Sequence, residues 1–349
     1  MTDSIEVRPS VAESDDELDA FVRAHPRGTL FHQSRWRRVV ERVFRHRPAG
    51  LEARAGDRLV GVLPLMQVPA LPIGRNLLSM PYAVYGGPVG ESDAVCAALV
   101  RGAQRLAEQR GARRLELRCL APLPAEVALP EGDLYVTFFK DLPADPADVL
   151  ARMPKKARAE ARKARERHGL ELIEGNWYLD DLHRLFALNK RSLGSPSLPA
   201  TLFRELLAEL GRDAVVHLVH RRREPLSAVL SFVDGDTLIA YYSGTAPAAD
   251  RDYSASNFMY LALQEWAVRR GFRRFDFCRS RRDSGAFRFK QHQGFEPTPL
   301  HYAYHLVRSR SLPTFTPSNP RTRLLRRAWS RLPSAVVDRI SPALARRLP

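Results

Sequence analysis

Two segments of this 349-residue chain repeat one another, and this repeat constrains the fold more than any other feature. Residues 110–117 read RGARRLEL and residues 270–277 read RGFRRFDF, an offset of 160 residues. A second match, of residues 85–87 (YGG) with 242–244 (YSG), has an offset of 157. In each half the expected order is hairpin, strand, glycine turn, helix and strand. A helix followed by Arg-Gly and a strand is common in α/β proteins, but two matches at nearly one offset favour a duplicated α/β unit.

The repeat divides the chain into two halves and a tail of different composition. We predict an N-terminal domain over residues 1–140, a second domain over 141–310 and a tail over 311–349. The tail is rich in arginine and places apolar residues at helical spacing, as in an amphipathic helix. Such a basic segment, which includes Trp329, suits an anionic membrane surface, although docking on the protein body is an equal alternative.

The charge of the chain predicts anionic partners. It has 55 Lys and Arg against 39 Asp and Glu, a formal net charge of +16 at pH 7. Nucleic acid, anionic lipid and phosphate-bearing substrates are the partner classes that this charge favours. Residues 145–168 are predicted to form one long basic helix, mostly solvated and with little acid for pairing. A charge run is more often a solvated face, but Lys155, Arg158 and Arg162 are our candidate phosphate contacts.

The cysteines and histidines predict neither a disulfide framework nor a metal site. Cys96, Cys119 and Cys278 are scattered and form no CxxC, which favours a reducing compartment. The acidic N-terminus lacks the apolar segment of a signal peptide. No apolar run approaches the ~20 residues that a spanning helix needs. We therefore predict a cytoplasmic protein, with peripheral contact at the inner membrane face through the tail.

Polar groups cluster at strand ends in residues 241–299, where loops of α/β proteins usually bind ligands. Asp276 alternates with two phenylalanines, so it is either a general base or the ion-pair partner of Arg279. Tyr82, Tyr85 and Tyr242 are candidate hydrogen-bond donors to a substrate, although buried strand tyrosines are more often core residues. No GxSxG or Cys–His pattern is present, so we expect direct transfer without a covalent enzyme intermediate.

The motifs together resemble a known group of enzymes. They are FHQ followed by Trp36 (residues 31–36), SMPYAVYGGP (79–88), the basic helix, SN and MY (256–260), FDFCRS (275–280), and FK with GFEP (289–297). This set resembles the Fem-type peptidoglycan aminoacyltransferases, and most of all the Fem-like proteins associated with exosortase/PEP-CTERM exopolysaccharide systems. The resemblance covers essentially the whole chain and implies two tandem GNAT-like (acyl-CoA N-acyltransferase-like) domains of mixed α/β structure.

The resemblance implies an acyltransferase that moves an aminoacyl or small acyl group onto an amine or hydroxyl. The expected acceptor is a phosphate-bearing or lipid-linked glycan, a precursor of peptidoglycan, exopolysaccharide or another part of the cell envelope. The expected donor is either aminoacyl-tRNA or acyl-CoA, and no permanently bound cofactor is expected.

The resemblance also assigns roles to residues. It gives Lys290 the task of stabilising the negative charge that develops on the carbonyl oxygen. Lys290→Ala is therefore expected to abolish transfer with a nearly unchanged melting temperature. Tyr242 and Asp276 complete the candidate catalytic set. The candidate substrate contacts near them are Asn257, Arg279, Ser280 and Phe289.

This sequence departs from the family pattern at several places. Cys278 stands where such proteins tend to have glycine, and Gln293 where they tend to have tryptophan. The usual pyrophosphate loop, Gln/Arg-x-x-Gly-x-Gly/Ala, is not evident, because Phe287 occupies the last small position after Arg282–Gly285. Its absence weakens the case for coenzyme A. The N-terminal half shows no counterpart of Lys290, so we expect that half to bind acceptor only.

Two alternatives stay open at this stage. One is an acyl-CoA-dependent N-acetyltransferase of a small amine. The other is a non-catalytic nucleic-acid-binding protein, which the basic charge fits. That second alternative lacks the aromatic residues that would be interleaved with the basic helix as stacking platforms for bases.

Overall fold

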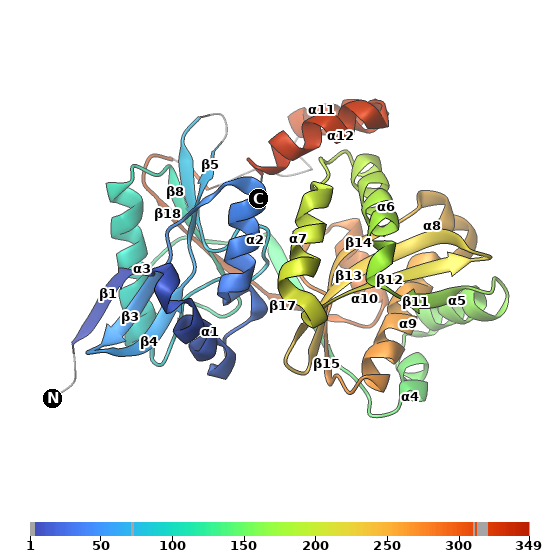
Figure 1. Ribbon diagram of the computed structural model, residues 1–349. Helices are drawn as coiled ribbons and strands as arrows, with labels where there is room; N and C mark the ends of the chain where they lie inside the picture. Colours follow the sequence, from blue (N-terminus) through green and yellow to red (C-terminus); the bar gives the residue numbers. More distant parts are fainter. Residues whose placement is uncertain (1–3, 71–72, 310, 313–319, 349) are drawn as a thin grey trace. The chain divides into compact units, whose positions relative to one another are not determined.

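The computed structural model describes residues 4–70, 73–309, 311–312 and 320–348, which divide into two compact units. Unit 1 comprises Met1–Tyr135, Pro299–Thr314 and Arg346–Pro349, and unit 2 comprises Val136–Thr298 and Phe315–Ala345. Helices and mixed sheets build both units (Figure 1).

Unit 1 contains two sheets, with strand orders β1-β3-β4-β7 and β2-β5-β6-β8-β18-β9. Within the second sheet β6 and β8 run parallel, with Leu77 opposite Leu115. Its helices are α1 (Asp15–Ala24), α2 (Ser34–Phe44) and α3 (Asp93–Gln109). Its strands are β1 (Ile5–Pro9), β2 (Arg47–Pro48), β3 (Leu51–Ala55), β4 (Arg58–Leu63), β5 (Met66–Pro69), β6 (Arg75–Leu78), β7 (Val89–Gly90), β8 (Arg114–Cys119), β9 (Glu131–Gly132) and β18 (His301–Leu306).

Unit 2 contains one sheet with the order β11-β12-β13-β14-β15-β10-β16, and β17 pairs with β10. Its strands are β10 (Tyr135–Asp141), β11 (Glu171–Glu174), β12 (Ala214–Arg221), β13 (Glu224–Asp234), β14 (Thr237–Thr245), β15 (Arg274–Asp276), β16 (Ser280–Arg281) and β17 (Glu296–Pro299). Its helices are α4 (Pro146–Ala151), α5 (Lys155–Glu166), α6 (Leu179–Ser192), α7 (Ala200–Leu210), α8 (Pro247–Tyr253), α9 (Ala255–Arg269), α10 (Gly285–His292), α11 (Pro320–Arg331) and α12 (Ser334–Ala345).

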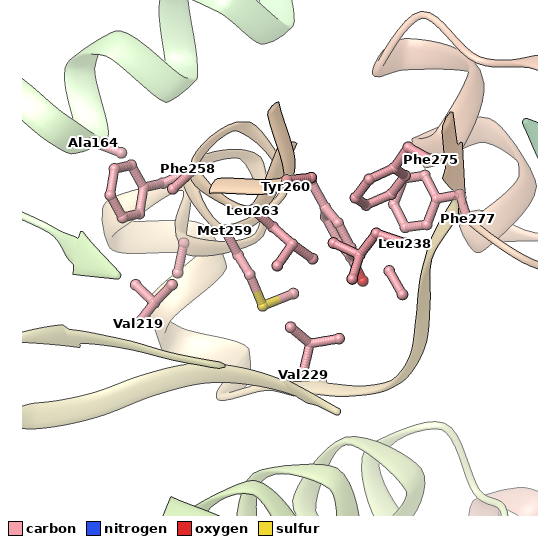
Figure 2. Close-up of a cluster of buried hydrophobic side chains, with 14 of the residues drawn as sticks. Ala164, Val219, Val229, Leu238, Phe258, Met259, Tyr260, Leu263, Phe275 and Phe277 are labelled. Atoms are coloured by element: carbon pink, nitrogen blue, oxygen red, sulfur yellow. The ribbon is translucent and has the colours of Figure 1, made fainter. Parts of the chain in front are cut away.

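Helix α9 is the central helix of unit 2 because it is apolar around most of its circumference. A helix of this kind is stable only when it is buried. Phe258, Met259 and Leu263 are at most 3% exposed and pack with strand residues Val219 and Val229 (Figure 2). The same cluster includes Phe275 and Phe277 at the end of β15, so the core extends to the predicted site.

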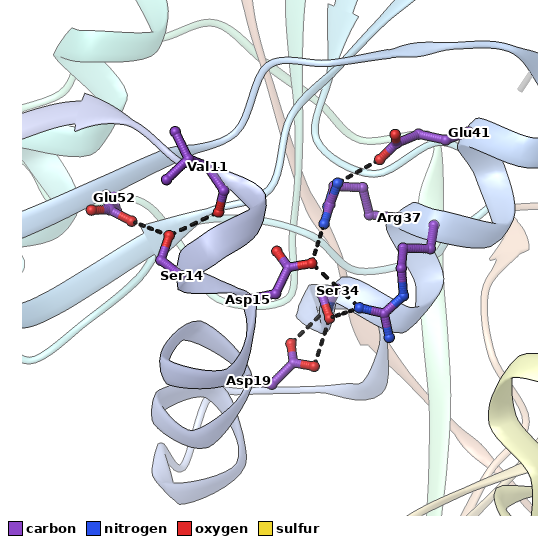
Figure 3. Close-up of polar contacts among 9 residues, drawn as sticks. Val11, Ser14, Asp15, Asp19, Ser34, Arg37, Glu41 and Glu52 are labelled. Atoms are coloured by element: carbon purple, nitrogen blue, oxygen red, sulfur yellow. Dashed lines mark hydrogen bonds and ion pairs between the residues drawn. The ribbon is translucent and has the colours of Figure 1, made fainter.

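The start of helix α2 is fixed by side chains of helix α1. The carboxylate of Asp19 accepts hydrogen bonds from Ser34 N at 2.6 Å and from Ser34 Oγ at 2.7 Å, and Arg37 pairs with both Asp15 and Glu41 (Figure 3). The carboxylate satisfies a free N–H group in the first turn, as an N-cap does.

The same region ties together two of the motifs from the sequence. His32 Nε2 lies 3.0 Å from Gly87 O, and Trp36 Nε1 donates to Pro81 O at 3.3 Å. Phe31 and Tyr85 make an edge contact with ring centroids 5.8 Å apart. These residues of FHQ…W and SMPYAVYGGP therefore hold one another in unit 1.

The domain limits in the structure differ from the predicted ones. The prediction placed limits after residues 140 and 310. The structure assigns Val136 onward to unit 2, because β10 pairs with β15, and it returns Pro299–Thr314 to unit 1, because β18 pairs with β8. Strand exchange of this kind leaves no local signal in the sequence.

The predicted single helix over residues 145–168 is wrong, because the structure has two helices, α4 and α5, with Pro154 between them. Proline disfavours helical backbone in the residue before it. Helix α5 also has a packed face, since Ala157, Ala161 and Ala164 are at most 5% exposed. Its cations therefore occupy the remaining circumference instead of surrounding the helix.

Helix α11 of the tail docks on other residues of unit 2. Trp329 Nε1 donates to Ser195 O at 3.1 Å, and the Arg326 guanidinium donates to Leu193 O at 2.6 and 3.0 Å. Docking on the body, one of the two alternatives, is therefore observed for these residues. The side chains of 320–325, 334 and 335, and all of 313–319, lie outside the described residues. None of the helices in the described ranges has the length and apolarity that crossing a bilayer requires.

Candidate active site

Two parallel strands of unit 2 separate where the site is predicted. Their ladder pairs Thr237 with Arg274 and ends where Ile239 pairs with Asp276, whereas β14 continues to Thr245. Strand β14 also carries a bulge, because Leu230 of β13 pairs with Tyr242 while the next residue pairs with Ala240. A bulge bends a strand and re-aims the side chains after it. The second half of β14 and the chain after β15 therefore diverge.

Lys290 of α10 holds the loop that comes after β15. Its ammonium group donates to the carbonyl oxygens of Phe277 at 2.5 Å, Cys278 at 2.9 Å and Arg279 at 3.1 Å. An ammonium group has three N–H donors, so these three bonds use its full capacity. Lys290 is 8% exposed, and the cation also lies 4.9 Å from the ring centroid of Phe277. The structure thus places Lys290 as the lock of this loop.

Burial weakens the charge of Lys290 without removing it. Desolvation lowers the pKa of Lys290 from its ordinary value of 10.5 to about 8, and nearby Arg279 lowers it further, while Cys278 and Asp276 oppose this shift. At neutral pH most molecules therefore keep the ammonium form that the three carbonyls require.

Asp276 shapes the same loop from the other side. Its Oδ1 accepts the backbone N–H of Cys278 at 2.7 Å, and the residue is 2% exposed. Cys278 has φ of 58°, in the left-handed region that favours glycine. Burial and the neighbouring Asp276 raise the pKa of the Cys278 thiol well above its usual value, so the thiol stays protonated. A neutral buried thiol is a poor nucleophile. Direct transfer without a covalent enzyme intermediate stays a prediction.

The remaining predicted residues of unit 2 lie around this loop. Asn257 Oδ1 accepts from Gln293 Nε2 at 2.6 Å, and Phe289 packs on Phe277 with ring centroids 6.3 Å apart. Ser280 is 5% exposed, and its Oγ has no hydrogen-bond partner among the described residues. Arg279 is half-buried. The structure therefore groups these four residues with Lys290 and Asp276.

Tyr242 lies in an aromatic cluster as well as beside the site. Its ring contacts Phe203 and Phe186, with centroids 5.2 and 5.9 Å away. Burial raises the pKa of Tyr242, so the phenol keeps its proton, and Cys278 and Arg279 lie within electrostatic range. The packing of Tyr242 among aromatic rings is that of a core tyrosine. Its catalytic role stays a prediction.

This arrangement agrees with the comparisons to known proteins. Residues 151–291 match the family described as "Acetyltransferase (GNAT) domain". This segment is a GNAT acyltransferase domain. The matched residues contain α5, α9, β14, β15 and Lys290, so the family match and the site geometry concern the same part of the chain.

Solved structures resemble the chain over both units. FemX is 15% identical with a TM-score of 0.63, covering 85% of this chain and 97% of that one. L-PGS from Bacillus licheniformis is 15% identical with a TM-score of 0.52, covering 91% and 97%. A tandem GNAT protein from the clavulanic acid biosynthesis pathway is 16% identical with a TM-score of 0.51, covering 86% and 98%. No curated protein matches the sequence. These likenesses confirm the predicted fold of two tandem GNAT-like domains.

The start of helix α9 in the GNAT domain is occupied by a carboxylate. Asp250 Oδ1 accepts from Ser256 N at 2.7 Å, and Asp250 Oδ2 accepts from Ser256 Oγ at 2.9 Å. Helix N-termini bind phosphate through free N–H groups and the helix dipole. A carboxylate at this position competes with a pyrophosphate for both. The predicted fragment of a pyrophosphate loop, Arg282–Gly285, lies elsewhere, and its Ser284 caps α10.

Tyr260 and Lys190 are residues of the GNAT domain that sequence reasoning did not select for the site, whereas Ser243 belongs to the polar cluster that it placed at the strand ends. Tyr260 OH donates to Ser243 Oγ at 2.9 Å, and its ring lies 4.1 Å from that of Phe277. This contact joins α9, β14 and the loop. Lys190 is half-buried, with its pKa lowered by burial and by Arg279. The one sequence signal for Lys190 is its position four residues after Phe186 in the same helix, which lets its ammonium group lie over the Phe186 ring.

Tyr82 and Tyr85 belong to unit 1, in the segment whose residues 85–87 match residues 242–244 of unit 2. Tyr82 stacks on Phe44 with centroids 3.9 Å apart, and its OH lies 3.0 Å from His46 Nε2. Tyr85 is 2% exposed and lines a cavity of about 120 Å³ with His32 and other residues. The packing of Tyr82 supports a core role, whereas Tyr85 adjoins space for a ligand.

The predicted phosphate contacts lie on α5 of the GNAT domain. Lys155 and Arg162 are exposed, whereas Arg158 is half-buried and donates to Ala151 O at 3.0 Å. Among the described residues no group of three His, Cys, Asp or Glu side chains is arranged to hold a metal ion.

Proposed function

We propose that this protein transfers an aminoacyl or small acyl group to an amine or hydroxyl of a cell-envelope precursor. Acyltransferase activity follows from the GNAT domain, and the likeness of the fold to FemX supports an envelope acceptor. The sequence resemblance further favours a peptidoglycan or exopolysaccharide precursor, in a system of the exosortase/PEP-CTERM type. The observation that carries the proposal is the Lys290-locked loop, Phe277–Arg279, at the point where β14 and β15 diverge.

Lys290 acts in this proposal by positioning. Acyl transfer develops negative charge on the carbonyl oxygen, and donors fixed in advance stabilise that charge best. Because the protons of Lys290 are bonded to three carbonyls, Lys290 fixes the backbone of the loop beside Tyr260 and Ser243. Arg279 is a second, half-buried cation of this loop, and Tyr242, whose phenol stays protonated, is a candidate donor to the oxyanion.

The donor that we propose is an aminoacyl-tRNA. Asp250 at the start of α9 disfavours a pyrophosphate there, and the exposed cations of α5, Lys155 and Arg162, suit a phosphate backbone. Acyl-CoA is the second candidate, because the solved tandem GNAT protein is described with reference to AcCoA. A purely non-catalytic nucleic-acid-binding role does not account for the GNAT domain.

A binding comparison at moderate salt tests the donor. Charged tRNA is compared with uncharged tRNA, and acyl-CoA with free CoA. We expect about tenfold tighter binding of charged tRNA, because phosphate contacts are common to both tRNAs and weaken with salt, whereas contacts with the aminoacyl group do not. A preference for acyl-CoA over CoA, with none between the tRNAs, would overturn the tRNA assignment.

A further inference from the structure

A pocket within unit 1 gathers four arginines around a cavity of about 280 Å³. Arg45, Arg47, Arg75 and Arg346 line it together with Gln67 and Gly74, and no acidic residue is among the described residues of the lining. We call these four residues the arginine pocket. The cavity far exceeds the ~10–15 Å³ that one water molecule requires, so it has room for a ligand of many atoms.

Two strand pairs position residues of this pocket. Arg47 of β2 lies opposite Gln67 of β5, and Arg75 opens β6 opposite Pro69. After β5, Ala70 N donates to Gly74 O, just before β6, at 2.9 Å. Two of the arginines therefore extend from paired strands, which hold their Cα positions at fixed spacing.

The arginines of this pocket differ in their partners from several other arginines of unit 1. Arg8 pairs with Glu52, Arg58 with Glu91 and Arg118 with Glu116. By contrast, none of the four pocket arginines makes an ion pair within the described ranges, and all four are exposed. Cations that converge without a counter-ion repel one another, and an anion relieves that repulsion.

The chemistry of guanidinium indicates the kind of anion. Its planar donors match the oxygens of phosphate in two-bond contacts, and such charge-assisted bonds are strong. Four guanidinium groups provide enough donors for two phosphate groups. We propose that the arginine pocket binds a ligand that carries two linked phosphates. This inference does not rest on the acyl-transfer proposal, because the pocket belongs to unit 1 and can be tested without any donor.

Titration of the full chain with inorganic pyrophosphate at 150 mM salt tests the proposal. Salt at this level suppresses binding to scattered surface charge. The variant is Arg47→Gln with Arg75→Gln, and the matched control is Arg105→Gln with Arg110→Gln, two exposed arginines of unit 1 outside the pocket. We expect at least tenfold weaker binding for the first pair and less than twofold change for the control. Equal losses in both pairs, or no saturable binding to the unmodified protein, would overturn the proposal.

Two further arms identify where the diphosphate comes from. One measures a nucleoside diphosphate in solution, and the other measures vesicles of neutral lipid doped with a lipid diphosphate. Binding that depends on Arg47 and Arg75 in either arm supports the pocket and names the source. Binding that is insensitive to those substitutions in both arms contradicts it. A melting curve for each variant controls for folding, and no shift is expected from exposed side chains.

Discussion

The two units contain the same pair of parallel strands but use the region beyond it differently. In unit 1 the ladder of β6 and β8 is continued by the chain itself. Ser79 N donates to Glu116 O at 2.9 Å, and Gly86 N donates to Arg118 O at 3.0 Å. In unit 2 the ladder of β14 and β15 ends at Ile239 and Asp276. The first unit closes the divergence with backbone hydrogen bonds, whereas the second places the candidate site there.

The cation beside each strand pair reflects this difference. In unit 1 Arg118 donates to Ala83 O at 3.0 Å and pairs with Glu116 at 3.0 Å, so it fixes the loop that fills the gap. In unit 2 Lys290 fixes a loop at the rim of the gap. That the N-terminal half binds acceptor only stays a prediction, and the filled gap beside Arg118 is a physical reason for it. The two units share a pair of parallel strands and differ in the loops at the ends of those strands.

Loss of Lys290 should have the largest effect on this comparison. Lys290→Met removes three hydrogen bonds to carbonyls in a buried place, and unsatisfied groups of this kind cost about 1–3 kcal/mol each. We expect at least a hundredfold loss of transfer and a destabilisation of about 3 kcal/mol or more. From the sequence we expected Lys290→Ala to leave the melting temperature nearly unchanged. The three hydrogen bonds of Lys290 predict instead that its loss lowers the melting temperature. Transfer rates and denaturant unfolding would measure both effects.

Lys140→Met is the matched control. Lys140 is partly buried in the same unit, and burial lowers its pKa, but its hydrogen bond to Gln293 O is 3.5 Å long, and its ammonium group otherwise lies 5.1 Å from the ring centroid of Phe295. It should keep transfer within about threefold, because a weak contact of this kind contributes little. Wild-type activity of Lys290→Met would contradict the role of the lock. So would equal losses in the two variants.

The pH dependence separates the two consequences of the Lys290 contact. With its pKa at about 8 in the folded protein against 10.5 ordinarily, Lys290 releases its proton first in the folded state as pH rises. Its contribution to the free energy of unfolding therefore becomes more favourable between about pH 8 and 10.5. Activity should instead fall above pH 8, because a neutral amine has only two donors for three carbonyls. If the free energy of unfolding and the transfer activity both rose above pH 8, Lys290 would not hold the loop as we infer.

Features set by local chain chemistry were predictable from the sequence. The repeated Arg-Gly turn is an example. Gly111 and Gly271 have φ of 59° and 84°, the left-handed backbone that ends a helix before a strand. The matched Arg-Gly turns were therefore sufficient to predict two units of similar fold. The cluster around Lys290 was predicted from the polar residues at the strand ends. The domain limits were not predictable, because β10 and β18 take their partners from distant sequence.

The direction of side chains could not be predicted either. The sequence placed Lys290 near the reacting carbonyl, but its actual partners depend on how α10 packs against the end of β15. Asp250 at the start of α9 is a similar case, since its carboxylate reaches a residue six positions later. Pro154, in contrast, was visible in the sequence and was sufficient to divide the basic helix.

The matched glycines of the repeat provide the second test of the comparison. A Cβ on Gly244 would lie 2.4 Å from backbone atoms of Leu185 and Phe186, whereas one on Gly87 would lie 2.7 Å from Cys119 Sγ and 3.1 Å from its Cα. Backbone yields less than a side chain does, so Gly244→Ala should cost about 3 kcal/mol and Gly87→Ala about 1–2 kcal/mol. Denaturant unfolding of both variants measures this order. The reverse order would show that the close approach of α6 to β14 is not the constraint on unit 2.

The smallest expected effect is at Cys278, where the loop itself differs from the pattern of the resembling family. Cys278 has φ of 58°, and a non-glycine residue in this region carries strain of about 1 kcal/mol or more. Glycine removes that strain but costs backbone entropy on folding, so Cys278→Gly should change stability by less than about 1 kcal/mol. The carbonyl of residue 278 remains available to Lys290, so transfer should stay within about twofold of wild type.

Cys278→Ala is the control, since it removes the thiol but keeps a Cβ. If both variants lost activity alike, the thiol would have a role beyond shaping the loop. Loss in Cys278→Gly alone would instead show that the Cβ at this position helps to hold the carbonyls against Lys290.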